Sequence, residues 1–338
     1  MKVQLDRLHA FVVRSLAQLD VPEADASVVA DSLVDAEATG QSGHGLIRLP
    51  FLLSRLRAGL IQPRPTMLLV QETSSSALLD GGNGLGPVVG TKAMAIAITK
   101  ARRSGAGLCA VKRSNHLGAM GFYVDRAARE GLIALGFSNT PPAMAAPGAS
   151  LPFLGTNPIA AAFPTLDSPV VVDLATSQVA RGRILKAARL GEAIPSGWGL
   201  DAKGRSTTDP AEAINGSLAP LGGAKGFALA TMVEALTGVL AGAAVGPQVG
   251  GTYLNSDKES DVGHCFIAID AEAIAPGFAG RMTALAAAIR SLEPIDARQE
   301  VRVSGDKRLR EANERRTDGV ELANDLVAEL EHATGTNI

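Results

Sequence analysis

Two histidines lie in polar loops flanked by glycines, a setting in which an imidazole can exchange protons with a bound molecule. His44 lies in the segment SGHGLIR and His116 in the segment RSNHLGAMG. A free imidazole titrates near pH ~6.5, so it can give or take a proton at neutral pH. The other three of the 5 histidines are expected on the surface or, for the last, in a buried structural role: His9, His332 and His264. His44 and His116 are therefore the candidates for acid–base chemistry.

Arg48 follows His44 by four residues, which places both side chains on one face if a helix begins in this loop. A guanidinium can hold a carboxylate through two parallel hydrogen bonds while a nearby imidazole protonates an oxygen on the adjacent carbon. The alternative is a helix arginine that forms a surface ion pair. From these residues alone, both interpretations stay open.

Two glycine-rich segments are candidates for binding phosphate groups. GLGPVVG (84–90) opens a predicted helix, but it departs from GxGxxG and lacks the acidic residue expected after the next strand, which argues against a Rossmann fingerprint. In LGGAKG (221–226), glycines at a helix start and Lys225 could approach an anion, although the Walker A pattern is missing. A tight turn explains LGGAKG equally well. Neither HExxH spacing nor a GxSxG elbow occurs, so no metal site and no serine nucleophile are predicted.

Apolar periodicity predicts the elements that must position these loops. Helices are expected at 5–16, 22–39, 45–59, 85–104, 117–130, 224–241 and 278–291, and from Asp318 onward, where Glu321 completes a capping-box pattern. Strands are expected at 68–72, 76–80, 108–112, 132–138, 158–164, 170–175 and 265–270. Three long loops are expected to form walls of the site: 139–157, 191–222 and 293–317.

Composition limits the class of protein. The 338 residues are 46% hydrophobic and 20% charged, which provides a sizeable core and excludes wholesale disorder. The net charge of -2 and the 4% aromatic content argue against nucleic-acid and anionic-membrane partners. Cys109 and Cys265 lie in apolar, strand-like runs, so neither a disulfide nor a cysteine zinc site is predicted.

The apolar stretch 226–246 requires a choice between a membrane span and a buried helix. It contains one charge, Glu234, and is interrupted by glycines. A carboxylate at the centre of a bilayer costs about 2.5–3.5 kcal/mol, so a buried helix is predicted. The N-terminal segment lacks the apolar block of a signal peptide, and a cytoplasmic location is expected.

Motifs spread in order over most of the chain resemble the type-2 malate/L-lactate dehydrogenase family, also described as L-sulfolactate dehydrogenase-like. These motifs are GHGLIRLP (43–50), DGGNGLGPVVG (80–90), SNHLGAMGFYV (114–124), LGTNPIA (154–160), VVDLATS (171–177), IPSGWGLDAKG (194–204), PLGGAKGFALATMVE (220–234), VGHCFIAID (262–270) and SGDKR (304–308). The resemblance implies a mixed α/β, non-Rossmann NAD(P)-binding fold, with a mixed, largely antiparallel sheet plus a helical region. It also implies a homodimer. We expect a helical region over 1–75, joined by 293–338, and a cofactor-binding and catalytic region over 76–292.

The resemblance also assigns site residues. His116 and His44 would be catalytic, and Arg48, Ser42 and Gly43 would bind the substrate, with Arg48 on its carboxylate. NAD or NADP would lie along Gly155, Thr156, Asn157, Asp173, Leu174, Ala175, Thr176, Ser177, Lys225, Gly226, Gly305 and Asp306. Arg183 belongs to a basic cluster after VVDLATS that could hold the 2′-phosphate of NADP, although a solvated basic face explains the cluster as well.

The expected reaction is hydride transfer between NAD(P) and a small 2-oxo or 2-hydroxy acid, with His116 slightly favoured over His44 as the proton donor. One alternative is reduction of a cyclic ketimine carboxylate, such as pyrroline- or piperideine-2-carboxylate. A second is an inactive nucleotide-binding relative, against which the joint retention of His44, Arg48, His116 and Lys225 argues. The family usually has serine at Gly43 and tyrosine at Leu52, and the resemblance would place both positions at the substrate. The substrate, its stereochemistry and the direction of the reaction therefore stay open.

Overall fold

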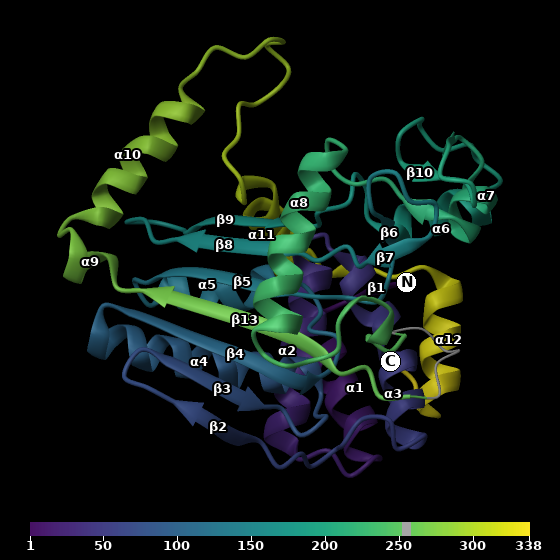
Figure 1. Cartoon of the computed structure of the whole chain (residues 1–338), viewed down its shortest axis with the longest axis horizontal. Helices are drawn as coiled ribbons and strands as arrows, with labels where there is room; N and C mark the ends of the chain where they lie inside the picture. Colours follow the sequence, from purple (N-terminus) through teal and green to yellow (C-terminus); the bar gives the residue numbers. More distant parts are fainter. Residues whose placement is uncertain (252–257) are drawn as a thin grey trace.

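A seven-stranded mixed sheet forms the centre of the computed structural model, which describes residues 1–251 and 258–338 (Figure 1). Within this sheet, β3 and β4 pair in parallel and the other neighbouring pairs are antiparallel. In spatial order the strands are β2 (Leu68–Glu72), β3 (Ser76–Asp80), β4 (Ala106–Ser114), β13 (Val262–Ile269), β5 (Ile133–Ser138), β8 (Ile159–Phe163) and β9 (Val170–Leu174). The expected mixed, largely antiparallel sheet is confirmed.

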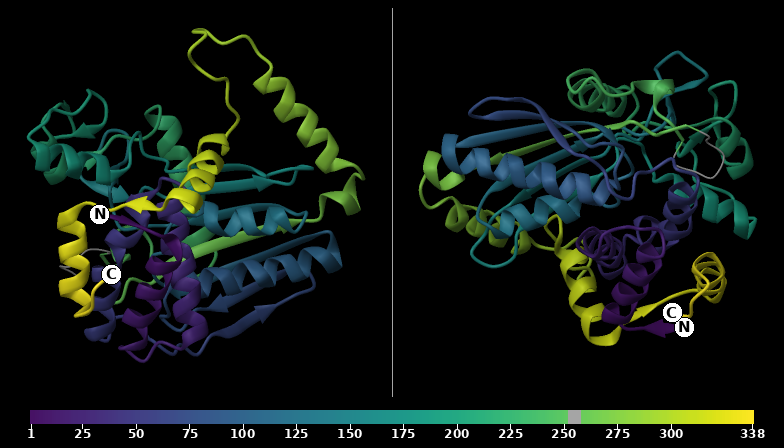
Figure 2. Two further views of the ribbon diagram at one scale, coloured as in Figure 1. Left: turned by 180° about the vertical axis from the view of Figure 1, so that it is seen from behind. Right: turned by 90° about the horizontal axis from the view of Figure 1, so that it is seen from below.

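Helices cover both faces of this sheet (Figures 1 and 2). On one face lie α4 (Gly86–Ser104) and α5 (Gly121–Arg129); on the other lies α8 (Ala224–Glu234), which continues into the π-helical turn η3 (Ala235–Val239). Strand side chains alternate between the two faces, so Phe266 of β13 packs in the core under α4 and α5, whereas Cys265 packs against Val233 of α8. Because both faces are covered, β13 is an almost continuous apolar run.

The N-terminal helices pack with the last helix of the chain (Figure 2). Their shared core contains Leu8, Phe11, Leu53 and Leu330. The helices are α1 (Leu5–Ala17), α2 (Glu23–Ala38), α3 (Leu49–Arg57) and α12 (Asn324–Thr334), and α11 (Asp306–Asp318) packs on α2. The chain ends are held together by a two-stranded sheet of β1 (Lys2–Val3) and β14 (Val320–Glu321).

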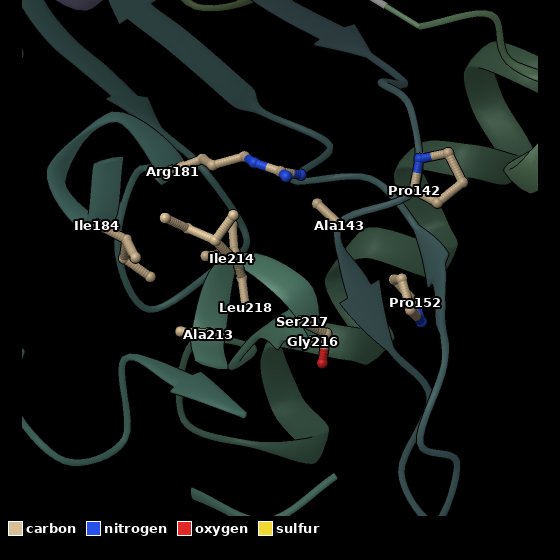
Figure 3. Close-up of a pocket in the computed structure, with 10 residues that line it drawn as sticks. All are labelled: Pro142, Ala143, Pro152, Arg181, Ile184, Ala213, Ile214, Gly216, Ser217 and Leu218. Carbon is tan, nitrogen blue, oxygen red and sulfur yellow. The ribbon is translucent and has the colours of Figure 1, made fainter. Parts of the chain in front are cut away.

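A smaller sheet and two short helices form a separate lobe beside α8 (Figure 1). The strands are, in order, β11 (Ser206–Thr207), β10 (Gly199–Leu200), β12 (Ser217–Leu218), β6 (Met144–Ala145) and β7 (Pro152–Leu154), and the helices are α6 (Arg181–Leu190) and α7 (Pro210–Asn215). Between α6, α7 and this sheet is a small pocket, across which Arg181 extends toward Ala143 (Figure 3). On the opposite side of the molecule, α9 (Ala271–Ile274), α10 (Phe278–Arg290) and the following loop project away from the body (Figure 1).

Four sequence predictions about these connections were wrong. The expected loop 293–317 contains α11, and the helix expected from Asp318 is instead β14 followed by α12, because Asp318 ends a helix rather than capping one. The expected loop 139–157 contains β6 and β7. The expected loop 191–222 contains β10, β11, α7 and β12, and all of these strands are two or three residues long. Strands this short carry almost no periodic signal and form only where a neighbouring strand satisfies their backbone.

The apolar stretch around Glu234 forms α8 and η3 against the sheet, as expected. In the described ranges, no helix is long and apolar enough to cross a membrane. Cys109 and Cys265 are both buried as free thiols.

Candidate active site

The imidazoles of His44 and His116 are stacked, with 5.4 Å between ring centroids and 13° between ring planes. His44 ends the 3-10 turn η1 (Ser42–His44), and a second such turn, η2 (Leu46–Arg48), follows before α3 begins. The sequence predicted a helix from residue 45; the two tight turns instead bring Arg48 to the N-cap of α3. His116 lies between β4 and α5. The two loops that the sequence singled out thus form one site.

Glu37 of α2 organises the loop that carries His44. Its Oε1 accepts a hydrogen bond from the backbone N–H of Leu46 at 2.8 Å, and its side chain is only 1% exposed. Burial raises the pKa of Glu37, whereas hydrogen bonds from Ser42 and Leu46 oppose the rise. Glu37 was not singled out in the sequence analysis. Its only signal in the sequence is that it is a carboxylate on a helix face made otherwise of small and apolar residues.

Both site histidines favour the neutral state. Burial first, and then the charge of Arg48, lowers the pKa of His44 to about 4, while Asp173 acts in the opposite direction. Burial, Arg48 and His44 together hold the pKa of His116 well below its usual range. Nδ1 of His116 accepts a hydrogen bond from the N–H of Gly118 at 3.1 Å. The neutral His116 ring therefore carries its proton on Nε2, from which it can donate.

Arg48 is anchored to the same loop. Its Nε donates to the carbonyl of Gly43 at 2.8 Å, which fixes the plane of the guanidinium. Ser42 and Gly43 are exposed, and a Cβ at Gly43 would meet no atom within 4 Å. Leu52, by contrast, is 3% exposed and packs in the helical core rather than at the site. The position at which the family usually has tyrosine is therefore buried in this chain.

Asp173, near the end of β9, lies where the histidine loops meet the expected cofactor segments. Its Oδ2 accepts hydrogen bonds from the backbone N–H of Gly121 at 2.8 Å and from Nε2 of Gln41 at 3.0 Å. The first bond caps the N-terminus of α5, where a carboxylate is favoured by the helix dipole. The carboxylate also raises the pKa of His44, in opposition to burial and Arg48.

Three of the expected cofactor segments lie side by side beyond Asp173. The N–H of Thr176 donates to the carbonyl of Thr156 at 2.9 Å, and the N–H of Leu221 donates to the carbonyl of Thr176, also at 2.9 Å. Gly226 makes the close approach possible, because a Cβ there would lie 2.7 Å from the Thr176 carbonyl oxygen. The segments 155–157, 173–177 and 221–226 therefore form one continuous wall.

The side chains of this wall are not equally available. Leu174 and Lys225 are exposed, and Ala175 is half-buried. Thr176 and Ser177 are buried, and Ser177 Oγ donates to the carbonyl of Val179 at 2.9 Å. Ser177, Thr176 and Gly226 can therefore contribute mainly through the shape of their backbone.

Asn157 is fully buried and serves the interior of the protein. Its Nδ2 donates to Glu234 Oε2 at 2.7 Å and to the carbonyl of Ala230 at 3.1 Å. Oε1 of Glu234 in turn accepts from the N–H of Gly246 at 2.8 Å and from Asn139 Nδ2 at 3.3 Å. Glu234, the single charge in the apolar stretch 226–246, is thus a buried hub that ties α8 to the wall of the site.

The last expected cofactor segment, Gly305 and Asp306, begins α11 and meets β9 at Val171. Gly305 packs on Val171, whose N would be 3.0 Å from a Cβ at residue 305. Asp306 pairs with Arg290 at 2.7 Å and also accepts from the N–H of Val303 at 2.8 Å. Arg183 is exposed on α6. The structure therefore brings Gly305 close to β9 but commits the Asp306 carboxylate to contacts within the chain.

The wall fits an anionic dinucleotide. The N-terminus of α8 is exposed, begins at the N-cap Gly223 and carries the exposed Lys225. A Cβ at Gly222 or Gly223 would meet no atom within 4 Å, so the surface at this turn is open, although the N–H of Gly222 donates to Gln178 Oε1 at 3.4 Å and that of Gly223 to the carbonyl of Pro220 at 3.0 Å. Backbone N–H groups, a helix dipole and a lysine together favour a pyrophosphate. Among the described residues, no group of histidine, cysteine and carboxylate side chains could hold a metal ion.

A non-Rossmann α/β fold, a histidine pair with an arginine, and a wall beside them that would accept an anionic dinucleotide are the features expected of a nicotinamide-dependent oxidoreductase. The sequence profile of the malate/L-lactate dehydrogenase family matches residues 3–331. The chain belongs to this family and is an NAD(P)-dependent dehydrogenase.

Individual relatives cover nearly the whole chain. The malate dehydrogenase of Pyrococcus abyssi is 40% identical over 316 residues, which is 90% of this chain and 86% of that protein. The (2R)-3-sulfolactate dehydrogenase (NADP(+)) of Chromohalobacter salexigens is 39% identical over 329 residues, or 97% and 96% of the two chains. The solved sulfolactate dehydrogenase from Methanocaldococcus jannaschii has a TM-score of 0.93 at 37% identity, covering 100% of this chain and 98% of that one. The Δ1-piperideine-2-carboxylate reductase of Pseudomonas syringae has a TM-score of 0.90 at 29% identity, covering 98% and 99%.

Proposed function

We propose that this dehydrogenase interconverts a small 2-oxo acid and the corresponding 2-hydroxy acid, at the site formed by His44, Arg48 and His116. The observation that carries the proposal is the stacked histidine pair, which lies beside a guanidinium and next to the wall that fits the dinucleotide. A 2-oxo acid presents a carboxylate and a carbonyl on adjacent carbons. These two groups match a fixed guanidinium and an imidazole N–H.

Each residue has a distinct role in this proposal. Arg48, held by Gly43, binds the carboxylate and orients the adjacent carbonyl. His116 takes up a proton when the substrate carboxylate pairs with Arg48, and its Nδ1 then gives up the hydrogen bond from the Gly118 N–H. The imidazolium transfers its Nε2 proton to the carbonyl oxygen, where it becomes the hydroxyl hydrogen, and is left as a neutral ring; in the reverse direction neutral Nε2 takes that proton back. His44 stacks on His116 and lines the same site. The backbone of Thr156 and Ala175 and the side chain of Lys225 would hold the dinucleotide, which supplies or accepts the hydride when it is bound.

A cyclic ketimine carboxylate is the second candidate substrate. The open space at Gly43 would admit a ring, and the reductase of Pseudomonas syringae is named for such a substrate. A protonated imine nitrogen needs no acid, so its reduction would depend little on His116. The two candidates are therefore separable by mutation.

The test is a reduction screen with NADH and NADPH against pyruvate, oxaloacetate, sulfopyruvate, pyrroline-2-carboxylate and piperideine-2-carboxylate. Turnover of a 2-oxo acid that falls strongly in His116→Asn supports the main proposal. Turnover of the cyclic imines alone, insensitive to His116→Asn, would replace it with the ketimine alternative. Binding of either nucleotide without turnover of any of the five would favour an inactive relative.

NADP is the cofactor that the basic helix α6 would favour. Arg183 is exposed near the start of α6, shortly after the segment 173–177 of the cofactor wall. In this proposal Arg183→Ala weakens NADPH binding at least about ten-fold more than NADH binding, because a bond to a charged phosphate is worth roughly 1.5–3 kcal/mol. Arg189→Ala, at the exposed far end of the same helix, is the control. Equal effects of Arg183→Ala on both cofactors would contradict the assignment.

A homodimer is also part of the proposal. The outer side of α8 and η3 is exposed and apolar, with Leu229, Met232, Val239 and Leu240. The projecting arm adds further exposed apolar side chains in Leu285, Leu292 and Ile295. Apolar surface of this extent on two parts of one chain suits an isologous contact with a second copy. Sedimentation equilibrium tests this directly: a dimer that Met232→Glu converts to monomers is expected, and a wild-type monomer would refute it.

A further inference from the structure

Arg308 of α11 contacts the active site through one intermediate side chain. Its Nη1 donates to Oε1 of Gln41 at 3.1 Å, and its Nη2 donates to Asp35 of α2 at 2.8 Å. Nε2 of Gln41 then donates to Oδ2 of Asp173 at 3.0 Å. Arg308, Gln41 and Asp173 thus form a continuous chain of hydrogen bonds that joins the C-terminal region to the end of β9.

The chemistry of Arg308 fixes the direction of this chain. A guanidinium has donors and no acceptor, so it must face the oxygen of the Gln41 amide. The amide NH2 group is then turned toward Asp173, where it meets a carboxylate that can only accept. If the amide were reversed, its oxygen would face the carboxylate and its NH2 group would face the guanidinium, and both contacts would be repulsive.

Gly121 allows Arg308 to reach this position. A Cβ at Gly121 would lie 2.7 Å from Arg308 Nη1 and 3.1 Å from Asp173 Oδ2, so any larger residue would displace both. With glycine in place, the N–H of Gly121 and the amide of Gln41 bind the same carboxylate oxygen. The Asp173 carboxylate is therefore held from two sides.

We propose that Arg308 and Gln41 are positioning residues that hold the Asp173 carboxylate at the N-terminus of α5 and tie it to the histidine loop, where the Gln41 carbonyl accepts from the His44 N–H at 2.7 Å, so that α11 controls the charge and orientation of the histidine pair. The proposal rests on the proposed function for its kinetic consequences only. Arg308 and Gln41 are 267 positions apart in the sequence, and Gln41 and Asp173 are 132 positions apart. Such a link gives the C-terminal segment a role at the reaction site although Arg308 does not itself reach the substrate residues.

Charged groups from several elements surround the chain. His44 faces Arg48 of η2, His116 and Asp173 of β9. At the other end, Asp35 faces Arg308 of α11 together with Asp125 and Arg126 of α5. Burial raises the pKa of Asp35 and Arg308 opposes this rise, so the ion pair also stabilises the packing of α11 on α2. A test must separate that structural contribution from the effect on His44.

The test compares Gln41→Met, Arg308→Met and the double variant, with Arg310→Gln as a control on the exposed side of α11, where Arg310 pairs with Glu300. Because the hydrogen bonds connect Arg308 to Asp173 through Gln41, both single variants should lower kcat about ten-fold with little change in KM, and the double variant should be no worse than either. Arg308→Met should also lower the unfolding temperature more than Gln41→Met, since it alone breaks the pair with Asp35. Additive losses of kcat in the double variant, or wild-type kcat in Gln41→Met, would overturn the proposal.

Gln41→Glu provides a pH readout that a purely structural role would not produce. The introduced carboxylate faces Asp173 Oδ2, so at high pH the two repel each other and the carboxylate of Asp173 is displaced. As the pH falls and the pair takes up a proton, the introduced side chain regains a donor toward Asp173 and an acceptor toward Arg308. Turnover relative to the wild type should therefore recover with falling pH in Gln41→Glu and not in Gln41→Met. Parallel profiles in the two variants would contradict the inference.

A readout that needs no turnover separates this inference from the proposed function. In 15N-labelled protein, the titration of the His44 imidazole should shift upward in Gln41→Met and Arg308→Met and stay at the wild-type value in Arg310→Gln, because Asp173 with one donor fewer attracts the imidazolium more strongly. An unchanged His44 titration would overturn the positioning role whether or not any substrate is turned over. A shifted titration in a protein that reduces none of the 2-oxo acids would refute the function and leave the positioning role standing.

Discussion

The His44 and His116 rings face each other at 5.4 Å between centroids, with planes 13° apart. Two imidazolium rings in this arrangement would repel each other, and Arg48 adds a third positive charge nearby. The pair can therefore hold at most one extra proton with ease. Its proton content should respond to any anion that enters the site.

The two histidines should differ in their effect on the reaction. His116→Asn should lower kcat for a 2-oxo acid by about 10²–10⁴-fold, because it removes the Nε2 donor. His44→Asn should act more on substrate binding than on kcat, since the same loop positions Arg48. Steady-state kinetics of both variants decide the matter. Loss of turnover in His44→Asn with normal turnover in His116→Asn would exchange the two roles.

Arg48→Lys should mainly raise KM. Lysine lacks the donor that binds the Gly43 carbonyl and cannot offer two parallel bonds to a carboxylate. A charge-assisted bond is worth roughly 1.5–3 kcal/mol, which predicts a loss of about ten- to a hundred-fold in kcat/KM. The matched control is Arg57→Lys in α3, an exposed arginine that binds the carbonyl of Ala333. Unchanged kinetics in Arg48→Lys would remove this residue from the substrate site.

Binding of a carboxylate should be accompanied by proton uptake. Arg48 lowers the pKa of His44 and of His116, and an anion paired with its guanidinium cancels much of that repulsion, so both values rise in the complex. An unreactive carboxylate such as oxamate should therefore bind more tightly as the pH falls toward the raised pKa. Calorimetry in buffers of different ionisation enthalpy measures the protons directly. Arg48→Gln should abolish the uptake, and uptake that persists in this variant would assign it to another group.

The same reasoning predicts two different pH limbs. The pH dependence of kcat/KM reports the free enzyme and should show an apparent pKa below that of a free imidazole, because burial and Arg48 both lower it. The pH dependence of kcat reports the enzyme–substrate complex and should show a higher apparent pKa than that of kcat/KM. Identical limbs in both profiles would mean that the substrate carboxylate does not compensate Arg48.

Glu234→Gln should destabilise the fold by about 3 kcal/mol. Its two oxygens accept from Asn139, Asn157 and Gly246, all of which donate, so an amide NH2 group in place of one oxygen would face a donor. Urea unfolding measures the loss, with the exposed Glu314→Gln on α11 as the control. A change within about 0.5 kcal/mol would show that the buried network relaxes around the amide.

The long elements and the two histidine loops were predictable from the sequence because their signals are local. The apolar run of β13 and the helical period of α4 or α8 are set by residues adjacent in the chain. His44 and His116 stood out for a related reason: each is a titratable side chain in a glycine-flanked loop between apolar segments. The match of motif after motif then indicated the family, as the comparison with known proteins confirmed.

Only the tertiary structure decided how these parts meet. The sequence contains no sign that Asp173 accepts from Gly121 and Gln41, because the bonds join β9 to residues 52 and 132 positions away. Arg308 and all of α11 except its last residue, Asp318, were placed in a loop, since that helix has one buried side chain, Ala312, and thus almost no apolar period to detect. Residue types and the local periodicity of apolar residues thus determined which groups could react. Their pairing and charge depend on contacts that form only when distant segments fold together, because burial and nearby charges are properties of the assembled site.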